Sequence, residues 1–317
     1  MTPNNPLISI IIATYNCSHL LKYAIKSVLN STYNNWELII IGDCCTDDTE
    51  SCVANFEDKR IRFVNLKENS GQQAKPNNVG VTLAKGKYVA FLNQDDMYFA
   101  DHLSLCVTHM ENNDDAEVIC VPGVQILPGA SEDLNFDKFK AVIVGVHPNG
   151  RYSPFENSVA SLWFLRKASL YKVGEWKTEN SLYVPPSQEW LFRAWKKGLK
   201  FHFPEYTGVL IIYSAERKNS YLQKSSYEHE YFINQLNDPI IKIKLLEQSA
   251  IFSSNLCHVL LYQKPLRHLL RAGAYPFYKL LEKLSIHPNS LNMFIRWGGK
   301  GKFISYSRKK TGLAEIQ

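Results

Sequence analysis

The sequence lacks the long apolar runs of a membrane-spanning protein. Its 317 residues are 45% hydrophobic, which is enough to form a full core. No run, however, reaches the roughly 18 uninterrupted apolar residues that a transmembrane helix requires. The first apolar run, residues 7–13, has neither a basic leader nor a small-residue cleavage site, so we expect no secretion signal. Any contact with a membrane is therefore expected to be peripheral.

The cysteines lack the pattern of a disulfide framework or a zinc site. There are seven of them, an odd number, and no Cys-x-x-Cys pair occurs. Unpaired cysteines are typical of a reducing compartment. We therefore expect a cytoplasmic protein whose cysteines serve mainly as small buried side chains.

Acidic residues are scarce in the C-terminal quarter of the chain. Residues 240–317 contain 13 Lys and Arg against three Asp and Glu, whereas residues 1–239 contain 23 against 27. On a helix expected to begin at Pro265, the cationic side chains Lys264, Arg267, His268 and Arg271 share one face. Such a helix is either a solvated basic face or an element that lies on an anionic membrane, and the sequence leaves both open. The acidic balance of the larger part and the absence of a binding motif argue against nucleic acid as a partner.

Strand and helix signals alternate along the first 121 residues. Apolar runs typical of strands occur at 7–13, 36–41, 60–66, 88–93 and 117–121. Helical spacing or capping residues occur at 18–29, 46–56, 78–84 and 101–110. This alternation predicts an α/β fold with an open, mostly parallel sheet flanked by helices, and ligands beyond the carboxyl ends of the strands.

The remainder of the chain has a different pattern. Residues 122–186 are rich in Pro, Gly and Asn, which predicts loops and short strands. A helix is expected at 188–197 and late strands at 201–203 and 209–213, after which the sequence becomes helical and basic. We therefore divide the chain into a domain at 1–238, with halves of about 1–121 and 122–238, and a helical basic C-terminal extension at 239–317.

Four acidic residues lie where the predicted strands end or a helix begins. Asp43 follows the second strand, Asp95 and Asp96 follow the strand at 88–93, and Glu189 opens the helix at 188–197. Two adjacent carboxylates repel each other unless a cation lies near them, so Asp95 and Asp96 suggest a metal site. The alternatives are a turn residue at Asp43, a helix cap at Asp95 and Asp96, and a favourable helix N-terminal charge at Glu189.

A set of ordered blocks carries a resemblance to a known family. The blocks are Ser9-Ile-Ile-Ile-Ala-Thr-Tyr-Asn16, Gly42-Asp-Cys-Cys-Thr-Asp-Asp-Thr49, Asn69-x-Gly71, Asn78-x-Gly80, Ala84-x-Gly86-x-Tyr88 and Leu92-x-x-Asp95-Asp96. Together they resemble the inverting glycosyltransferases of family 2, which have the GT-A fold, over roughly residues 7–215. The resemblance implies a nucleotide-sugar half at about 1–121 and an acceptor half at about 122–238.

The resemblance also implies roles for individual residues. Nucleotide-binding residues would be Thr14, Tyr15, Asn16, Asp43, Asn78, Asp95 and Arg217, with Asp43 accepting a hydrogen bond from a uracil-type base and Arg217 contacting a phosphate. Asp95 and Asp96 would hold Mg²⁺ or Mn²⁺ on the diphosphate, since these ions prefer oxygen ligands. Glu189 would be the general base that removes the acceptor proton. A solvated loop around Arg217 is the alternative for that residue.

Three departures from the family pattern stand at Gly42, Asn93 and Gln188, where acids are frequent. Trp163, Trp176 and Trp190 are expected to pack in the core, although stacking on an acceptor sugar is the alternative.

The resemblance implies inverting transfer from a nucleoside-diphosphate sugar, with a UDP-sugar favoured, to a glycan or lipid-linked acceptor. The expected setting is surface polysaccharide synthesis at the cytoplasmic face of a membrane. One alternative is a nucleotidyltransferase, which is disfavoured because no Gly-rich phosphate loop follows the first strand. The other is a non-catalytic assembly module.

Overall fold

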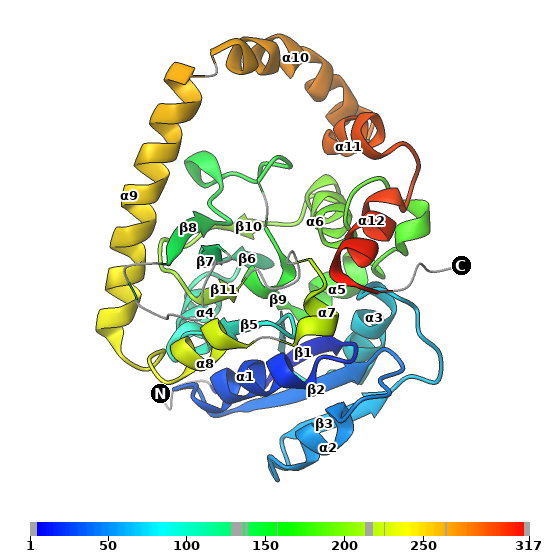
Figure 1. Ribbon diagram of the computed structural model, residues 1–317, viewed down its shortest axis with the longest axis vertical. Helices are drawn as coiled ribbons and strands as arrows, with labels where there is room; N and C mark the ends of the chain where they lie inside the picture. Colours follow the sequence, from blue (N-terminus) through cyan, green and yellow to red (C-terminus); the bar gives the residue numbers. More distant parts are fainter. Residues whose placement is uncertain are drawn as a thin grey trace.

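The protein has an α/β fold built around two sheets (Figure 1). The computed structural model describes residues 5–127, 136, 139–156, 158–212, 218–224, 226–263 and 265–313. The strands are β1 (Ile8–Thr14), β2 (Trp36–Gly42), β3 (Ile61–Asn65), β4 (Tyr88–Phe91), β5 (Asp96–Tyr98), β6 (Val118–Cys120), β7 (Gly123–Leu127), β8 (Lys140–Val144), β9 (Trp163–Arg166), β10 (Phe201–His202) and β11 (Val209–Ile212).

Helices flank these sheets and form the C-terminal part. They are α1 (Ser18–Leu29), α2 (Thr49–Ala54), α3 (Ala74–Leu83), α4 (His102–Asn112), α5 (Lys167–Val173), α6 (Pro186–Lys196), α7 (Ser220–Gln223), α8 (Tyr227–Ile233), α9 (Pro239–Gln263), α10 (Pro265–Lys283), α11 (Asn289–Trp297) and α12 (Lys302–Thr311).

The larger sheet has the strand order β10-β6-β9-β4-β1-β2-β3. Its neighbouring strands are parallel except for β9, which runs antiparallel to β4 and to β6. The register pairs Thr14 with Gly42 and Ile11 with Phe91. The carboxyl ends of β1, β2 and β4 therefore meet at one edge of the sheet. This arrangement confirms the predicted mostly parallel sheet.

The predicted strand at 88–93 ends earlier than expected, and the chain passes there from one sheet to the other. Strand β4 stops at Phe91, and β5 begins at Asp96 in the smaller sheet, where Asp96 pairs with Ile211. The Asp96 N–H donates to the Asn93 carbonyl at 3.2 Å, which closes the turn between the two strands. The smaller sheet has the strand order β5-β11-β7-β8. The adjacent carboxylates thus lie where the chain crosses from the larger sheet to the smaller one.

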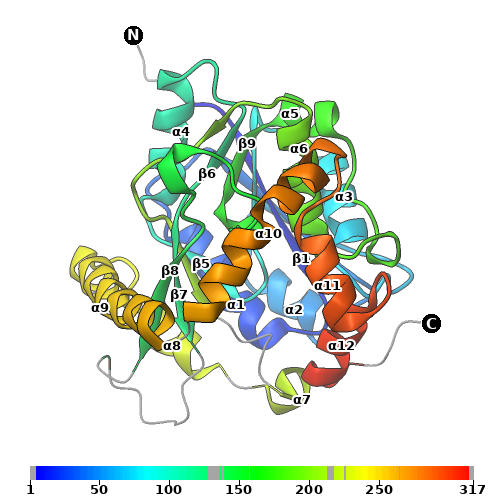
Figure 2. The ribbon, with the colours of Figure 1, turned by 90° about the horizontal axis from the view of Figure 1, so that it is seen from above.

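The C-terminal helices extend from one side of the domain and return to the other. Helix α9 packs along β8, and Lys242 of α9 forms an ion pair with Asp101 at 2.9 Å. Figures 1 and 2 show α10 crossing above the domain, after which α11 and α12 lead back to it. The Gly301 N–H donates to the Leu182 carbonyl at 2.9 Å, which anchors the start of α12.

Two features of this region bear on the predicted membrane contact. The side chains of residues 255–272 lie outside the described part of the structure, and so does the predicted cationic face of Lys264, Arg267, His268 and Arg271. Within the described residues, every helix is too short or too polar to cross a bilayer.

The three predicted aromatic residues pack on one another in the core. Trp163, Trp176 and Trp190 are almost fully buried. The ring centroids of Trp163 lie 5.4 Å from those of Trp176 and 5.7 Å from those of Trp190. Core packing is therefore their role, and stacking on an acceptor sugar is excluded for rings buried in this way.

Gly80 allows α3 to pack closely on β1, and its replacement provides a test of this packing. A Cβ atom at position 80 would lie 2.4 Å from Ile11 Cγ2, whereas Gly273 on α10 has nothing within 4 Å. We expect Gly80→Ala to lower the free energy of unfolding by about 1–3 kcal/mol, because a buried strand must shift. Gly273→Ala should leave it unchanged or raise it by up to about 1 kcal/mol. Denaturant unfolding of both variants is the measurement, and equal stability of the two would contradict the close packing.

Candidate functional site

A cavity of about 300 Å³ lies at the carboxyl ends of β1, β2 and β4. Five of the predicted binding residues line it: Thr14, Tyr15, Asp43, Asp95 and Asp96. The Asp43 N–H donates to the Thr14 carbonyl at 2.8 Å, which holds the ends of β1 and β2 together. The position agrees with the general rule for ligand sites in open α/β sheets.

Asp43 fixes the loop that forms one wall of the cavity. Its carboxylate accepts hydrogen bonds from the Ser70 N–H at 2.9 Å, the Ser70 hydroxyl at 2.8 Å and the Gly71 N–H at 2.8 Å. Asn69 donates to the Asp43 carbonyl at 2.8 Å. A carboxylate has about four lone-pair positions, so three of them are used by this loop. Asp43 therefore has a structural role in shaping this wall of the cavity.

Asp96 is a buried carboxylate that is held by two neutral donors. Its Oδ2 accepts hydrogen bonds from Asn93 Nδ2 at 2.8 Å and from the Ser161 hydroxyl at 2.5 Å. Burial raises the pKa of Asp96 well above its usual range, and the neighbouring Asp95 charge raises it further. The two side-chain hydrogen bonds and one from the Ile212 backbone oppose the shift. An ionised Asp96 is therefore costly unless a cation is present.

The pair of carboxylates fits a hard divalent cation. Asp95 and Asp96 line the same cavity, and the His229 ring nitrogen Nε2 contacts the Asp95 carbonyl at 2.8 Å, which fixes the backbone there. In the described parts of the chain, no group of three His, Cys, Asp or Glu side chains is placed to hold a metal. Two protein carboxylates are sufficient where phosphate oxygens and water complete the coordination, as is common for Mg²⁺.

The departures at Asn93 and Gly42 have a structural reason. Asn93 donates to Asp96, which an ionised Asp at this position could not do. A Cβ atom at position 42 would lie 2.6 Å from Asn65 Oδ1, so an acidic side chain there would require the Asn65 side chain to move. Both departures reflect local packing and hydrogen bonding around the cavity.

The sequence interpretation missed Gln94, although it lies beside the acidic pair. Its Oε1 accepts hydrogen bonds from the Thr14 hydroxyl at 2.8 Å and from the Tyr15 N–H at 3.0 Å. Its Nε2 donates to the Tyr221 hydroxyl at 3.0 Å. This one amide connects the end of β1 to α7. The other missed lining residues of interest are Ser187, Tyr221 and Arg308.

Two of the predicted nucleotide-binding residues lie outside the described lining. Asn16, with a backbone φ of 46°, accepts a hydrogen bond from the Thr46 N–H at 2.8 Å. Asn78 makes two hydrogen bonds to the backbone of Trp176, at 3.0 and 2.9 Å. Their observed contacts stabilise loops, and a direct nucleotide contact stays a prediction for both. Arg217 lies outside the described residues.

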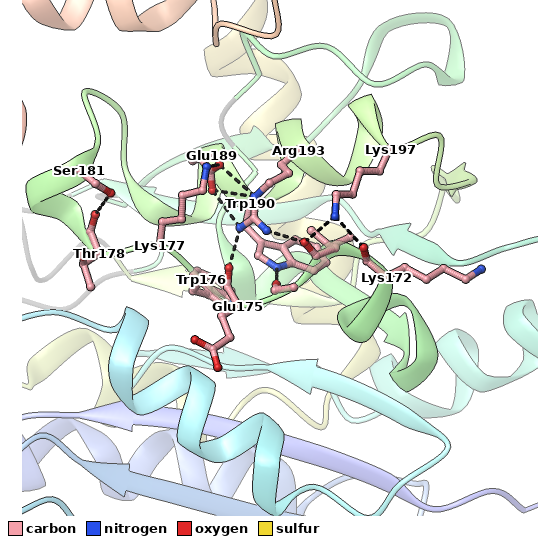
Figure 3. A network of polar contacts seen from close by, with 12 residues as sticks. Lys172, Glu175, Trp176, Lys177, Thr178, Ser181, Glu189, Trp190, Arg193 and Lys197 are labelled. Carbon is pink, nitrogen blue, oxygen red and sulfur yellow. Dashed lines mark hydrogen bonds and ion pairs between the residues drawn. The ribbon is translucent and has the colours of Figure 1, made fainter.

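Glu189 is also absent from the described lining, where Ser187 of the same helix is present. Figure 3 shows Lys177 and Arg193 converging on the Glu189 carboxylate. The distances are 2.9 Å from Lys177 Nζ and 3.0 Å from Arg193 Nε. Arg193 also donates to the Val173 and Glu175 carbonyls at 2.6 and 2.7 Å. This network ties α6 to the end of α5, and the role of Glu189 as a base stays a prediction.

Asp96 gives a direct test of the cation site. Because its pKa is raised in the folded state, its ionisation destabilises the metal-free protein as the pH rises above the unfolded value of about 3.9. We expect Asp96→Asn to raise the melting temperature of the metal-free protein at pH 7 and to remove the stabilisation by Mn²⁺ that the unaltered protein shows. Thermal unfolding with and without Mn²⁺ is the measurement. Asp114→Asn, which alters an exposed carboxylate, is the control; an Mn²⁺ shift that survives in Asp96→Asn would contradict the assignment.

Curated relatives match about a third of the chain. A putative teichuronic acid biosynthesis glycosyltransferase of Bacillus subtilis, TuaG, is 41% identical over 105 residues, which are 32% of this chain and 41% of TuaG. A UDP-Glc:alpha-D-GlcNAc-diphosphoundecaprenol beta-1,3-glucosyltransferase of Escherichia coli, WfgD, is 36% identical over 107 residues, which are 34% of this chain and 42% of WfgD. The match thus spans about two fifths of the length of these relatives.

A solved structure matches nearly the whole fold. The structure of S. aureus TarS 1–349 in complex with UDP-GlcNAc superposes with a TM-score of 0.54 at 16% identity, covering 96% of this chain and 88% of the TarS 1–349 chain. At this identity the likeness concerns the fold alone, which is of the GT-A type expected from the sequence blocks.

The family model agrees with the position of the cavity. The model for glycosyl transferase family 2 matches residues 9–135, the segment that contains β1, β2, β4 and the Asp95–Asp96 pair. Residues 9–135 of this chain are therefore similar to the glycosyl transferase family 2 domain.

Proposed function

We propose that the protein transfers a sugar from a nucleoside-diphosphate sugar, with inversion, to a glycan or lipid-linked acceptor. The observation that carries this proposal is the cavity at the strand ends, where Asp95 and Asp96 lie beside Thr14, Tyr15 and Asp43. A two-carboxylate cation site beside a pocket for a base and ribose is what binding of such a donor requires.

The cation would be Mg²⁺ or Mn²⁺, held by Asp96 and Asp95. It would supply positive charge to the diphosphate as this group leaves. The protein residues contribute independently of it. Asn93 and Ser161 orient the Asp96 carboxylate, and Gln94 orients the end of β1. A UDP-sugar is the favoured donor because WfgD is named for UDP-Glc and TarS was solved with UDP-GlcNAc.

The proposed setting is the synthesis of a cell-surface polysaccharide at the cytoplasmic face of a membrane. TuaG is named for teichuronic acid biosynthesis, and WfgD is named for a diphosphoundecaprenol-linked acceptor. These names support a glycan or lipid-linked acceptor here. The six cysteines of the described part are free thiols, which agrees with a reducing compartment.

We propose that Glu189 acts as the general base once an acceptor has displaced Lys177 from its carboxylate. Two ion pairs hold the carboxylate, so an acceptor hydroxyl would have to compete with Lys177 and Arg193 for its oxygens. The Lys177 side chain is 52% exposed, so this partner is the one that an incoming acceptor could displace. Glu189 would then act as a base with Arg193 still holding its orientation.

A second candidate function is a non-catalytic assembly module that binds a nucleotide. The observation that favours it is the same network, because Glu189 is fully engaged and Ser187 is the residue of α6 that lines the cavity. The nucleotidyltransferase alternative has less support, since the turn after β1 (Thr14-Tyr-Asn-Cys-Ser18) contains neither Gly nor a cationic residue.

A donor panel separates these functions. Incubation with UDP- and GDP-sugars and saccharide acceptors should release nucleoside diphosphate in the presence of Mn²⁺ and not in the presence of a chelator. We expect Glu189→Gln to lower kcat about 10²- to 10⁴-fold with unchanged donor binding, because a base acts only on the reacting acceptor.

The controls distinguish a chemical role from a structural one. Asp114→Asn should retain full turnover. If Glu189→Gln instead lowers the melting temperature and donor affinity together, then Glu189 only positions α6. Release of pyrophosphate would support the nucleotidyltransferase, and donor binding without turnover under every condition would support the assembly module.

We further propose that α10 and α11 contact an anionic membrane. Residues 273–313 carry eight Lys and Arg against one Glu, and this Glu282 is buried and paired with Lys279 at 2.7 Å. Phe277, Leu280 and Leu284 are about half exposed and follow one another at helical spacing. Exposed apolar side chains among cationic ones fit the interface of an anionic bilayer.

Vesicle sedimentation tests this contact. The full-length protein should sediment at low salt with vesicles that contain phosphatidylglycerol, and less so with neutral vesicles or at high salt, because screening weakens the attraction. The double variant Leu280→Ser with Leu284→Ser should sediment several-fold less than Ile251→Ser, which alters an exposed side chain of α9. Protein that stays in the supernatant with anionic vesicles at low salt would disprove the membrane contact.

A further inference from the structure

Helix α12 brings a cationic side chain to the cavity from the far end of the chain. Arg308 lines the cavity, and its Nη1 donates to the Gly71 carbonyl at 2.7 Å across 237 positions of sequence. Gly71 is also the residue whose N–H is bound by Asp43. Arg308 therefore lies against the loop that Asp43 holds in place, in a part of the chain that the family model does not match.

The position of Arg308 is fixed by several contacts of α12. The Asn219 N–H donates to the Lys310 carbonyl at 2.9 Å, which joins α12 to the segment preceding α7. Leu313, just beyond α12, also lines the cavity. Figures 1 and 2 show α12 as the end of the path that leads from α9 over the domain and back. The helix thus forms part of the cavity wall, and Arg308 is its charged residue among the described lining residues.

Arg308 is a cationic side chain in a cavity whose other described lining residues are acidic or neutral. Three carboxylates, Asp43, Asp95 and Asp96, line the cavity, and among its described lining residues Arg308 is the one cationic side chain. A nucleoside diphosphate brings further negative charge into this acidic surrounding. A cation on Asp95 and Asp96 would offset part of it, and a guanidinium offers five donors in a planar fork that matches phosphate oxygens.

Tyr221 also lines the cavity, and the charges of Asp95 and Arg308 both act on its hydroxyl. The Tyr221 hydroxyl accepts a hydrogen bond at 3.0 Å from Nε2 of Gln94, the residue that precedes Asp95. Burial raises the pKa of Tyr221 above its usual range, the Asp95 charge adds to this shift, and the Arg308 charge opposes it. Both charges therefore act on the same small region of the cavity.

We propose that Arg308 contacts the diphosphate of the bound donor, so that the C-terminal region completes the donor site. This inference rests on the proposed function, since it assumes a nucleoside-diphosphate ligand. Arg308 would bind the phosphate oxygens that face away from Asp95 and Asp96, and the Gly71 carbonyl would keep its side chain in place.

Calorimetric titration of the full-length protein with UDP and with UMP, each with Mn²⁺, tests the contact. We expect Arg308→Gln to weaken UDP binding about 10- to 100-fold, because a charge-assisted hydrogen bond is lost. The loss for UMP should be at least five-fold smaller. Arg308→Lys should bind UDP with intermediate affinity, since it keeps the charge without the fork. Lys309→Gln, an exposed residue on the same helix, is the matched control and should bind as the unaltered protein does.

Each other outcome has a definite meaning. Equal UDP affinity of Arg308→Gln and Lys309→Gln would overturn the inference. An equal loss for UDP and UMP would also overturn it, because Arg308 would then only position the Gly71 loop. A folding defect would be recognised in two ways. It would lower the melting temperature, and it would lower the UDP affinity of Arg308→Gln and Arg308→Lys equally. If the unaltered protein binds neither UDP nor GDP, the proposed function itself fails, and this result is distinct from a failure of the Arg308 contact.

Discussion

The cost of burying an ionised carboxylate governs the site of this protein. Asp96 is almost fully buried at the start of β5, beside a second acid, and its pKa is raised by burial and by that neighbour. Two neutral donors, Asn93 and Ser161, are too weak to offset the charge fully. An ionised Asp96 thus demands a compensating charge, from a cation or from a bound proton, at the point where the chain passes from the larger sheet to the smaller one.

This demand explains why residues that carry no charge are important to the site. Gln94 binds the end of β1 and the Tyr221 hydroxyl at the same time, so one amide aligns three elements around the cavity. Ser161 accepts a hydrogen bond from the Asn93 N–H at 3.0 Å and donates to Asp96. These contacts hold the carboxylate in one orientation, and such preorganisation reduces the free energy that a ligand would otherwise spend on ordering the site.

The sequence was informative where the determining forces are local. Apolar runs and helical spacing predicted β1, α1 and β2 to within a few residues, and adjacent acids after an apolar strand predicted the location of Asp95 and Asp96. The strand expected at 209–213 is β11, but the smaller sheet that it forms with β5 and β7 was not predicted, because these strands are short and pair across distant segments. Ser161 and Tyr221 could not be found for the same reason, since no local pattern distinguishes them from other polar residues.

The sequence around Glu189 also contains a signal for a structural role of this residue. Arg193 stands four positions after it on the same helix, a spacing that favours an ion pair, so the sequence itself contained the alternative to a catalytic role. The resemblance to the family took precedence in the interpretation. The second partner, Lys177, comes from a loop that only the tertiary structure brings near, and local spacing could not reveal it.

The C-terminal region unites two properties that the sequence presented separately. Its basic composition suggested a surface for a membrane, whereas the structure also brings Arg308 of α12 to the cavity. The exposed apolar residues of α10 and the cavity residue of α12 lie on consecutive parts of one helical path. Because α12 is anchored to Leu182 and to Asn219 of the domain, this path holds any surface presented by α10 and α11 at a fixed place relative to the acidic pair. A lipid-linked acceptor would meet the cavity in a defined orientation for that reason.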